Sequence, residues 1–185
     1  MTLIIVLVVV VLLALFVMSA YNRLIRLRNT RENAFADIDV QLKQRHDLIP
    51  QLVETVKGYA KHESETLLQV TNARNAAMAA NTIDEKIQAE NKLSSALSGL
   101  KVTLEAYPEL KANTNFLQLQ EEMSDIENKL AAARRYFNTT TREYNNAVEI
   151  FPNNIVASMF NFRREVMFDL GEERAELDKA PTISF

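Results

Sequence analysis

The stretch from Asn115 to Phe151, with the sequence NFLQLQEEMSDIENKLAAARRYFNTTTREYNNAVEIF, decides the fold of this chain. Its apolar and small side chains recur at alternating steps of three and four residues, which is the spacing of a coiled-coil-like seam on one face of a helix. The stripe consists of Phe116, Leu119, Met123, Ile126, Leu130, Ala133, Phe137, Thr140, Tyr144, Val148 and Phe151. The stretch therefore predicts one long helix in an all-α bundle.

The composition supports the same fold class and excludes several kinds of function. The chain has 185 residues but only 3 glycines and 4 prolines, too few for the frequent turns of a β-sandwich or barrel. The absence of cysteine excludes disulfides, thiolate metal sites and a cysteine nucleophile. A formal net charge of -3 leaves no basic field to attract nucleic acid, so no nucleic-acid partner is expected.

The N-terminal run from Leu3 to Ala20 contains no charged residue and only Ser19 as a polar member. With its flanks, a helix of this length reaches roughly the ~30 Å of a bilayer core. We interpret residues 1–21 as a retained transmembrane anchor. The alternatives are a cleaved signal peptide and a buried core helix. A signal peptide is disfavoured because no basic residue precedes the run and Met18 stands where a small residue is needed before the cleavage site.

Basic residues follow the run directly. Tyr21 occupies the position of an interfacial aromatic, and Arg23, Arg26, Arg28 and Arg31 come next. The positive-inside rule therefore predicts a single-pass protein whose C-terminal part lies in the cytoplasm. These arginines either bind anionic lipid headgroups or are solvated charges that only set the topology.

The apolar stripe then continues and predicts one very long helix over residues 22–80. Pro50 interrupts it, and because the stripe keeps its phase across the proline, a kinked helix is favoured over a loop. Gly58 is a second weak point of this helix.

Three further helices are predicted, and the four together form an antiparallel up-and-down bundle over residues 22–170. Thr82 with Glu85 is a capping box that starts a helix over 82–106, which Tyr107 and Pro108 end. The seam helix covers 115–151, and a last short helix covers 155–170. Residues 171–185 are expected to form a flexible tail.

Helix lengths suggest self-assembly. Residues 22–80 as one helix reach about 90 Å, whereas the two returning helices reach about 37 Å and 55 Å. The returning helices leave part of the first stripe uncovered. The last helix is expected to cover some of it, and other copies of the chain the rest.

Known catalytic, metal-binding and phosphate-binding motifs are missing or incomplete. His62 and Glu63 begin a zinc-binding HExxH string, but the second histidine is absent. His46 lies more than four turns from His62, so the two cannot hold one ion within a helix. No phosphate-binding glycine loop is present. We therefore expect no metal, no cofactor and no enzymatic activity.

Two sets of residues remain as candidate interaction sites. Arg45, His46 and Asp47 lie beside Pro50 and form either an interaction surface or hinge, with Gly58, or a tie between this helix and its neighbours. The apolar tail end, with Ile183 and Phe185, either docks in a groove of a neighbour or is disordered.

The sequence resembles the LemA family of bacterial membrane-anchored proteins. The likeness covers nearly the whole chain and is most specific between Arg45 and Tyr59. Matching segments are Ile38–Pro50, Leu52–Ala60, Tyr107–Ala112, Glu127–Lys129, Phe151–Ile155 and the ending from Ala180 to Phe185. The resemblance implies a single-pass anchor followed by a helical bundle, located in the bacterial cytoplasmic (inner) membrane. It supplies no catalytic residues.

Two functions fit these observations. The first is a non-enzymatic membrane scaffold that forms homo-oligomers through its long helices and organises or remodels a bilayer with anionic headgroups. The second is an adaptor or signalling stalk that binds and regulates another membrane protein, such as a protease.

Overall fold

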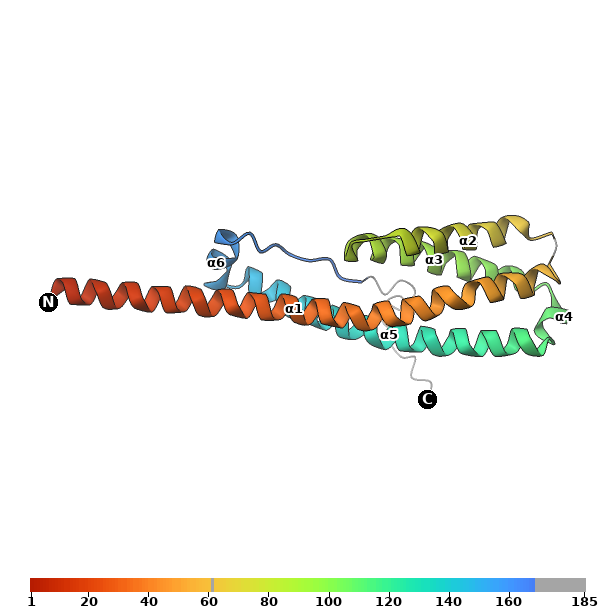
Figure 1. Cartoon of the computed structure of the whole chain (residues 1–185), viewed down its shortest axis with the longest axis horizontal. Coiled ribbons are helices and arrows are strands. Elements are labelled where there is room, and N and C mark those ends of the chain that lie inside the picture. The colour runs from red at the N-terminus through yellow and green to blue at the C-terminus, as the bar shows by residue number, and fades with distance from the viewer. Residues whose placement is uncertain (61, 169–185) are drawn as a thin grey trace, which may run out of the picture. The chain divides into compact units, whose positions relative to one another are not determined.

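The computed structural model describes residues 1–60 and 62–168, and every regular element within them is a helix. The helices are α1 (Thr2–Lys57), α2 (Ser64–Ala79), α3 (Ile83–Leu104), α4 (Pro108–Lys111), α5 (Thr114–Glu149) and α6 (Asn153–Met159). Figure 1 shows them in chain order. The predicted all-α fold with a long apolar N-terminal helix is confirmed.

The chain divides into two compact units. The first unit comprises residues 1–36 and 135–167, and the second comprises residues 37–134 together with Phe168 among the described residues. Helices α1 and α5 therefore each contribute one part to the first unit and the other part to the second.

In the first unit, α1 packs against the C-terminal part of α5 and against α6. Leu24 shares a buried cluster with Tyr144 and Ala147, and Phe35 meets Phe137 edge to face with ring centroids 5.4 Å apart. The later residue of α1, Phe35, thus contacts the earlier residue of α5, Phe137, so the two helices are antiparallel. Ala157 of α6 completes this cluster.

In the second unit, α1, α2, α3 and the start of α5 enclose one apolar core. Figure 1 shows α2 and α3 side by side as a hairpin, joined by only three residues. A connection that short forces neighbouring helices to run antiparallel. The buried core side chains are Ile49, Val53, Val56, Ala60, Leu67, Val70, Ala77, Leu93, Leu100, Leu104, Leu110 and Phe116.

The predicted helix starts are confirmed where a local cap specifies them. The Thr82 hydroxyl accepts from the Glu85 backbone N–H, and the Glu85 carboxylate accepts from the Thr82 backbone N–H, which completes the capping box. At the start of α5, the Asn113 side chain accepts from the Phe116 backbone N–H at 3.0 Å.

The predicted helix over residues 22–80 is wrong. Helix α1 continues through Pro50 as expected, but it ends at Lys57, just before Gly58. The Val56 carbonyl accepts from both the Tyr59 and the Ala60 backbone N–H, which tightens the last turn. The chain then starts again as α2.

The predicted last helix over 155–170 is also too long. Helix α6 ends at Met159, and Asn161 adopts a left-handed backbone conformation with φ of 59°, which cannot continue a helix. Residues 162–168 follow without helical structure. The Asn145 side chain holds them by donating to the Glu165 carbonyl at 2.9 Å and accepting from the Glu165 N–H at 2.8 Å.

These corrections remove the length argument for self-assembly. Residues 22–57 of α1 and the 36 residues of α5 are of matching length, about 54 Å each. The α1 stripe is buried inside the chain at Leu24, Ile38, Leu42, Ile49 and Val56. No excess of uncovered helix is left within the described residues.

The apolar N-terminal part of α1 is the exception, because its side chains are exposed from Leu3 to Leu13 and again at Leu15, Phe16 and Met18. Among the described residues, α1 is the helix that is long and apolar enough to cross a membrane. Such exposure argues against the alternative of a buried core helix, since a core helix would be covered by the rest of the chain.

Candidate functional site

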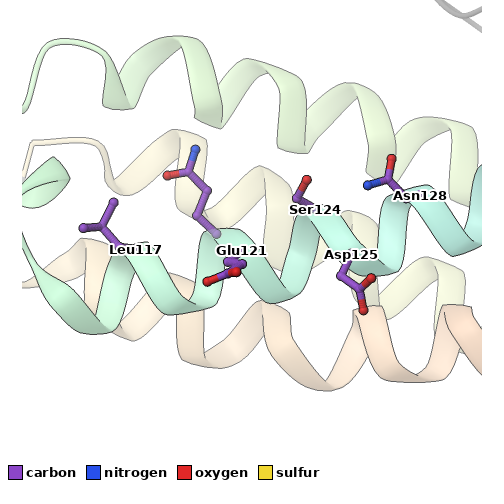
Figure 2. Close-up of a pocket in the computed structure, with 6 residues that line it drawn as sticks. Leu117, Glu121, Ser124, Asp125 and Asn128 are labelled. Carbon is purple, nitrogen blue, oxygen red and sulfur yellow. The ribbon is translucent and has the colours of Figure 1, made fainter.

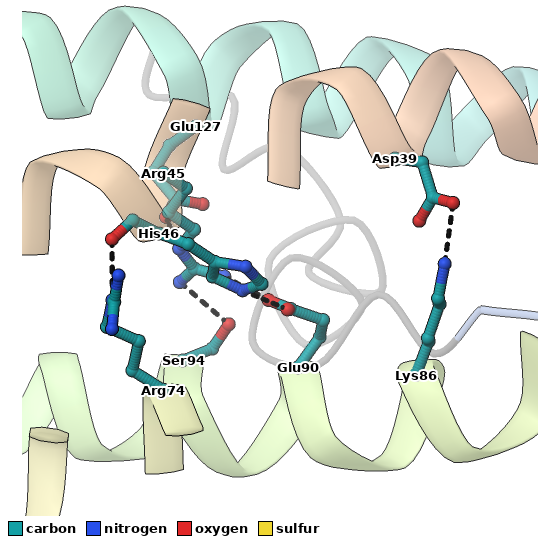
Figure 3. A network of polar contacts seen from close by, with 8 residues as sticks. All are labelled: Asp39, Arg45, His46, Arg74, Lys86, Glu90, Ser94 and Glu127. Carbon is teal, nitrogen blue, oxygen red and sulfur yellow. Dashed lines mark hydrogen bonds and ion pairs between the residues drawn. The ribbon is translucent and has the colours of Figure 1, made fainter. Parts of the chain in front are cut away.

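A cluster of charged side chains lies inside the second unit and joins four helices. Helix α1 contributes Arg45 and His46, α3 contributes Glu90 and Ser94, and α5 contributes Glu127 (Figure 3). Helix α2 adds Arg74, as described below. We call these residues the Arg45 network.

Arg45 is the centre of the Arg45 network. Its side chain is only 2% exposed, although it carries a full charge. Its Nη1 donates to Glu90 Oε2 at 3.1 Å and its Nη2 to Ser94 Oγ at 3.0 Å, while its Nε lies 2.8 Å from Glu127 Oε1. A buried guanidinium is tolerated when carboxylates surround it in this way, because they replace the lost water.

Glu90 is shared between two partners. Its second carboxylate oxygen, Oε1, lies 2.6 Å from Nε2 of His46, and its side chain is 1% exposed. Both oxygens of a buried carboxylate are thus occupied by side chains of α1. Removing any one of the three residues leaves a buried polar group without its partner.

Pro50 creates the contact that brings α2 into the network. A proline has no N–H, so the carbonyl four residues earlier, that of His46, loses its helical hydrogen bond. Arg74 of α2 replaces it by donating from Nε to the His46 carbonyl oxygen at 2.6 Å. The proline in α1 therefore provides an acceptor for a neighbouring helix.

The other predicted members of this site lie at the surface. Asp47 is exposed and forms a 3.6 Å pair with Lys43, one helical turn earlier. Pro50 is itself exposed. A Cβ added at Gly58 meets only the Thr55 carbonyl oxygen at 3.5 Å, an ordinary contact, so no close packing requires glycine there.

The predicted membrane-interface residues divide into two groups. Tyr21, Arg28 and Arg31 contact aromatic rings of the first unit, and Arg31 is buried with an ion pair to Glu165 at 3.4 Å. Arg23 and Arg26 are exposed. The tail positions Ile183 and Phe185 lie outside the described residues.

Sequence reasoning missed the partners of Arg45 and His46. One signal was available in α3, where Glu90 lies three residues after Ile87 and three before Leu93. An acidic residue on an apolar stripe predicts a buried carboxylate that needs a cation. Arg74 carried no such signal, because it serves an acceptor that depends on Pro50.

Two surface hollows are present among the described residues. One hollow, about 450 Å³, is open and is lined by side chains of α5, namely Leu117, Gln120, Glu121, Ser124, Asp125 and Asn128 (Figure 2). A second, about 410 Å³, lies where α1 ends and α2 begins, and Lys57 is the charged residue of its lining. Within residues 1–60 and 62–168, no group of three or more metal-ligating side chains is gathered.

Comparisons with known proteins agree on one family. The model of the LemA family matches residues 34–185, which include the Arg45 network but not the apolar run. The chain is also similar to Protein LemA of Metamycoplasma hominis, with 28% identity over 160 residues, covering 85% of this chain and 73% of that protein.

Proposed function

The chain belongs to the LemA family, and we propose that it acts as a membrane-anchored scaffold without enzymatic activity. In this proposal, the apolar start of α1 holds the chain in a bacterial cytoplasmic membrane. The helical units then associate with other copies and organise or remodel the bilayer. Arg23 and Arg26, which are exposed, would bind anionic headgroups next to the anchor.

The observation that carries the proposal is the continuity of α1. One unbroken helix contains the exposed apolar run and, further along, buried side chains such as Leu24, Ile38 and Arg45. No flexible linker separates anchor from bundle. This construction suits a protein whose first unit is attached directly to its own membrane anchor.

The polar groups of the second unit support a structural role. Arg45, Glu90 and His46 are bound to one another and are nearly inaccessible to solvent. A catalytic acid or base must reach its substrate, and these groups point into the helix interfaces (Figure 3).

Reconstitution tests the scaffold directly. The full chain, extracted in detergent and imaged as single particles, should contain several copies. Added to vesicles of phosphatidylcholine and phosphatidylglycerol without any partner, it should form ordered assemblies or change vesicle shape. Monomers on unaltered vesicles would refute the scaffold.

The second candidate is the adaptor, and one observation favours it. The α1 stripe is buried at Leu24, Ile38, Leu42, Ile49 and Val56 among the described residues, so this stripe does not need another copy to cover it. For an adaptor, the purified protein should be a monomer that forms a complex of fixed stoichiometry with one membrane protein. The adaptor is refuted if assembly proceeds from the pure protein alone.

The proposed topology has its own test, because the chain contains no cysteine. Val102→Cys places a single thiol at an exposed position of α3. In intact cells a membrane-impermeant maleimide should not label it, whereas permeabilised cells should be labelled. Labelling of intact cells would place the bundle outside the cytoplasm.

A further inference from the structure

The end of α5 and helix α6 expose a group of large apolar side chains. From Ile150 to Phe162 the chain has no charged residue. The exposed members are Ile150, Phe151, Ile155, Met159 and Phe160, with Phe151 at 74% and Met159 at 68% exposure. We call these five residues the α5–α6 apolar patch. These residues lie within eleven consecutive positions, 150–160, and large apolar side chains that are exposed close together mark sites of contact with a protein or a membrane.

The patch is not the inner face of α6. That face is formed by Val156 and Ala157, which are almost fully buried, and Ala157 belongs to the cluster around Leu24. Helix α6 is therefore apolar toward the chain and apolar toward the outside. Ile155 and Met159, one helical turn apart, form the exposed apolar face of α6, beside its polar residues Asn153, Asn154 and Ser158.

Tyr21 fixes the depth of the patch relative to the anchor. The Tyr21 ring meets Phe160 edge to face with centroids 4.8 Å apart. Tyr21 directly follows the Leu3–Ala20 run, which spans about 27 Å as a helix. When that run crosses a bilayer, Tyr21 lies at the membrane–water interface, and Phe160 lies beside it at the same level. Figure 1 shows α6 next to α1 in this unit.

The direction of α5 and the flanking charges agree with this placement. Helix α5 is antiparallel to α1, so its C-terminal end faces the anchor side of the first unit. The uncharged segment is followed by Arg163 and Arg164, both exposed, and Arg164 pairs with Glu149 at 2.7 Å. Exposed arginines beside an apolar surface are typical of segments that lie in the interface of an anionic membrane.

We propose that the α5–α6 apolar patch is a second membrane contact, which inserts into the headgroup and upper acyl region of the leaflet at which α1 leaves the bilayer. This inference rests on the proposed membrane anchoring by the Leu3–Ala20 run. It adds a second point of attachment, so the first unit is held by a helix and by a loop-and-helix surface. Two attachments fix the rotation of the unit about the anchor axis.

Tryptophan fluorescence tests the contact, because the chain contains no tryptophan. Three single-tryptophan versions of the full chain are reconstituted in phosphatidylcholine and phosphatidylglycerol vesicles, with or without brominated acyl chains. Phe151→Trp reports on the patch and Phe16→Trp on the anchor. Val102→Trp is the matched control, since Val102 is as exposed as Phe151 but lies on α3.

The expected result is a blue-shifted Phe151→Trp emission that loses intensity in brominated vesicles, while Val102→Trp changes in neither respect. If Phe16→Trp is quenched but Phe151→Trp emits like Val102→Trp, the patch contact is refuted and the anchor stands. If Phe16→Trp is not quenched either, the anchoring itself is refuted. A blue-shifted Phe151→Trp without quenching indicates cover by protein, such as a second copy, and also overturns the lipid contact.

Discussion

Glu90→Ala should strongly destabilise the second unit, because Glu90 serves two buried partners. The substitution leaves Arg45 Nη1 and His46 Nε2 without the carboxylate oxygens that lie 3.1 Å and 2.6 Å away. Breaking a buried ion pair by removing one partner typically costs about 3–5 kcal/mol. Since Glu127 still neutralises Arg45, we expect the lower end, about 3 kcal/mol of unfolding free energy.

Glu127→Ala is the matched comparison. Glu127 binds the same guanidinium at 2.8 Å, but its side chain is 38% exposed, so water replaces much of what it provides. We expect a loss of about 1 kcal/mol or less. The two variants therefore separate the effect of burial from the effect of charge.

Urea unfolding of the full chain in micelles, followed by circular dichroism, measures both losses. Hydrogen exchange of the α3 amides locates them, since α3 carries Glu90. Exchange in α6, which belongs to the first unit, should change little. The reasoning is refuted if Glu90→Ala costs no more than Glu127→Ala, because burial would then not decide the strength of the network.

Three further substitutions test other contacts. Arg74→Ala should lower the free energy of unfolding by about 1–2 kcal/mol, because it leaves the His46 carbonyl unpaired. In a Pro50→Ala background the loss should be about 1 kcal/mol smaller, because the new backbone N–H at position 50 can bind that carbonyl. A double-mutant cycle with no coupling would contradict this explanation. Thr82→Ala removes the α3 cap and should lower stability by about 1 kcal/mol in urea unfolding, whereas an unchanged midpoint would show that the cap is dispensable. Burial, followed by the nearby charge of Glu165, raises the pKa of Tyr144. Its stabilising contribution is therefore complete below the unfolded value of about 10 and is lost as pH rises through the raised pKa. In Tyr144→Phe the free energy of unfolding should therefore fall less steeply at alkaline pH. Identical pH profiles for the two proteins would show that the ionisation of Tyr144 does not contribute to the pH dependence.

Local signals predicted the two ends of α3 and the start of α5. The capping box at Thr82, the proline at 108 and the Asn113 cap are written in neighbouring residues, and the structure places α3 and α5 accordingly. The end of α1 at Lys57 could not be predicted in this way. Helix α2 folds back onto the same core as α1, so Val56 and Leu67 are both buried and the stripe continues across the break.

The candidate site was predicted only in part, because its partners come from distant segments. Arg45 and His46 were recognised as unusual, but Glu90 lies 45 residues from Arg45. Similarly, Arg31 was expected near lipid headgroups, yet Glu165 and the Phe137 ring enclose it. Such pairs depend on which helices become neighbours, and sequence periodicity does not specify that.

In the proposed membrane anchoring, bilayer thickness acts on this chain through the helix that the anchor shares with the first unit. A membrane whose hydrocarbon layer does not match the Leu3–Ala20 run changes the tilt of the helix or the local lipid thickness. Because α1 is helical throughout from Ala20 to Leu24, and Leu24 is packed against Tyr144, no joint at the surface can absorb a tilt. With the run in a bilayer as proposed, the packed residues of the first unit tilt together with the anchor, so hydrophobic mismatch in the lipid sets the tilt angle of this unit.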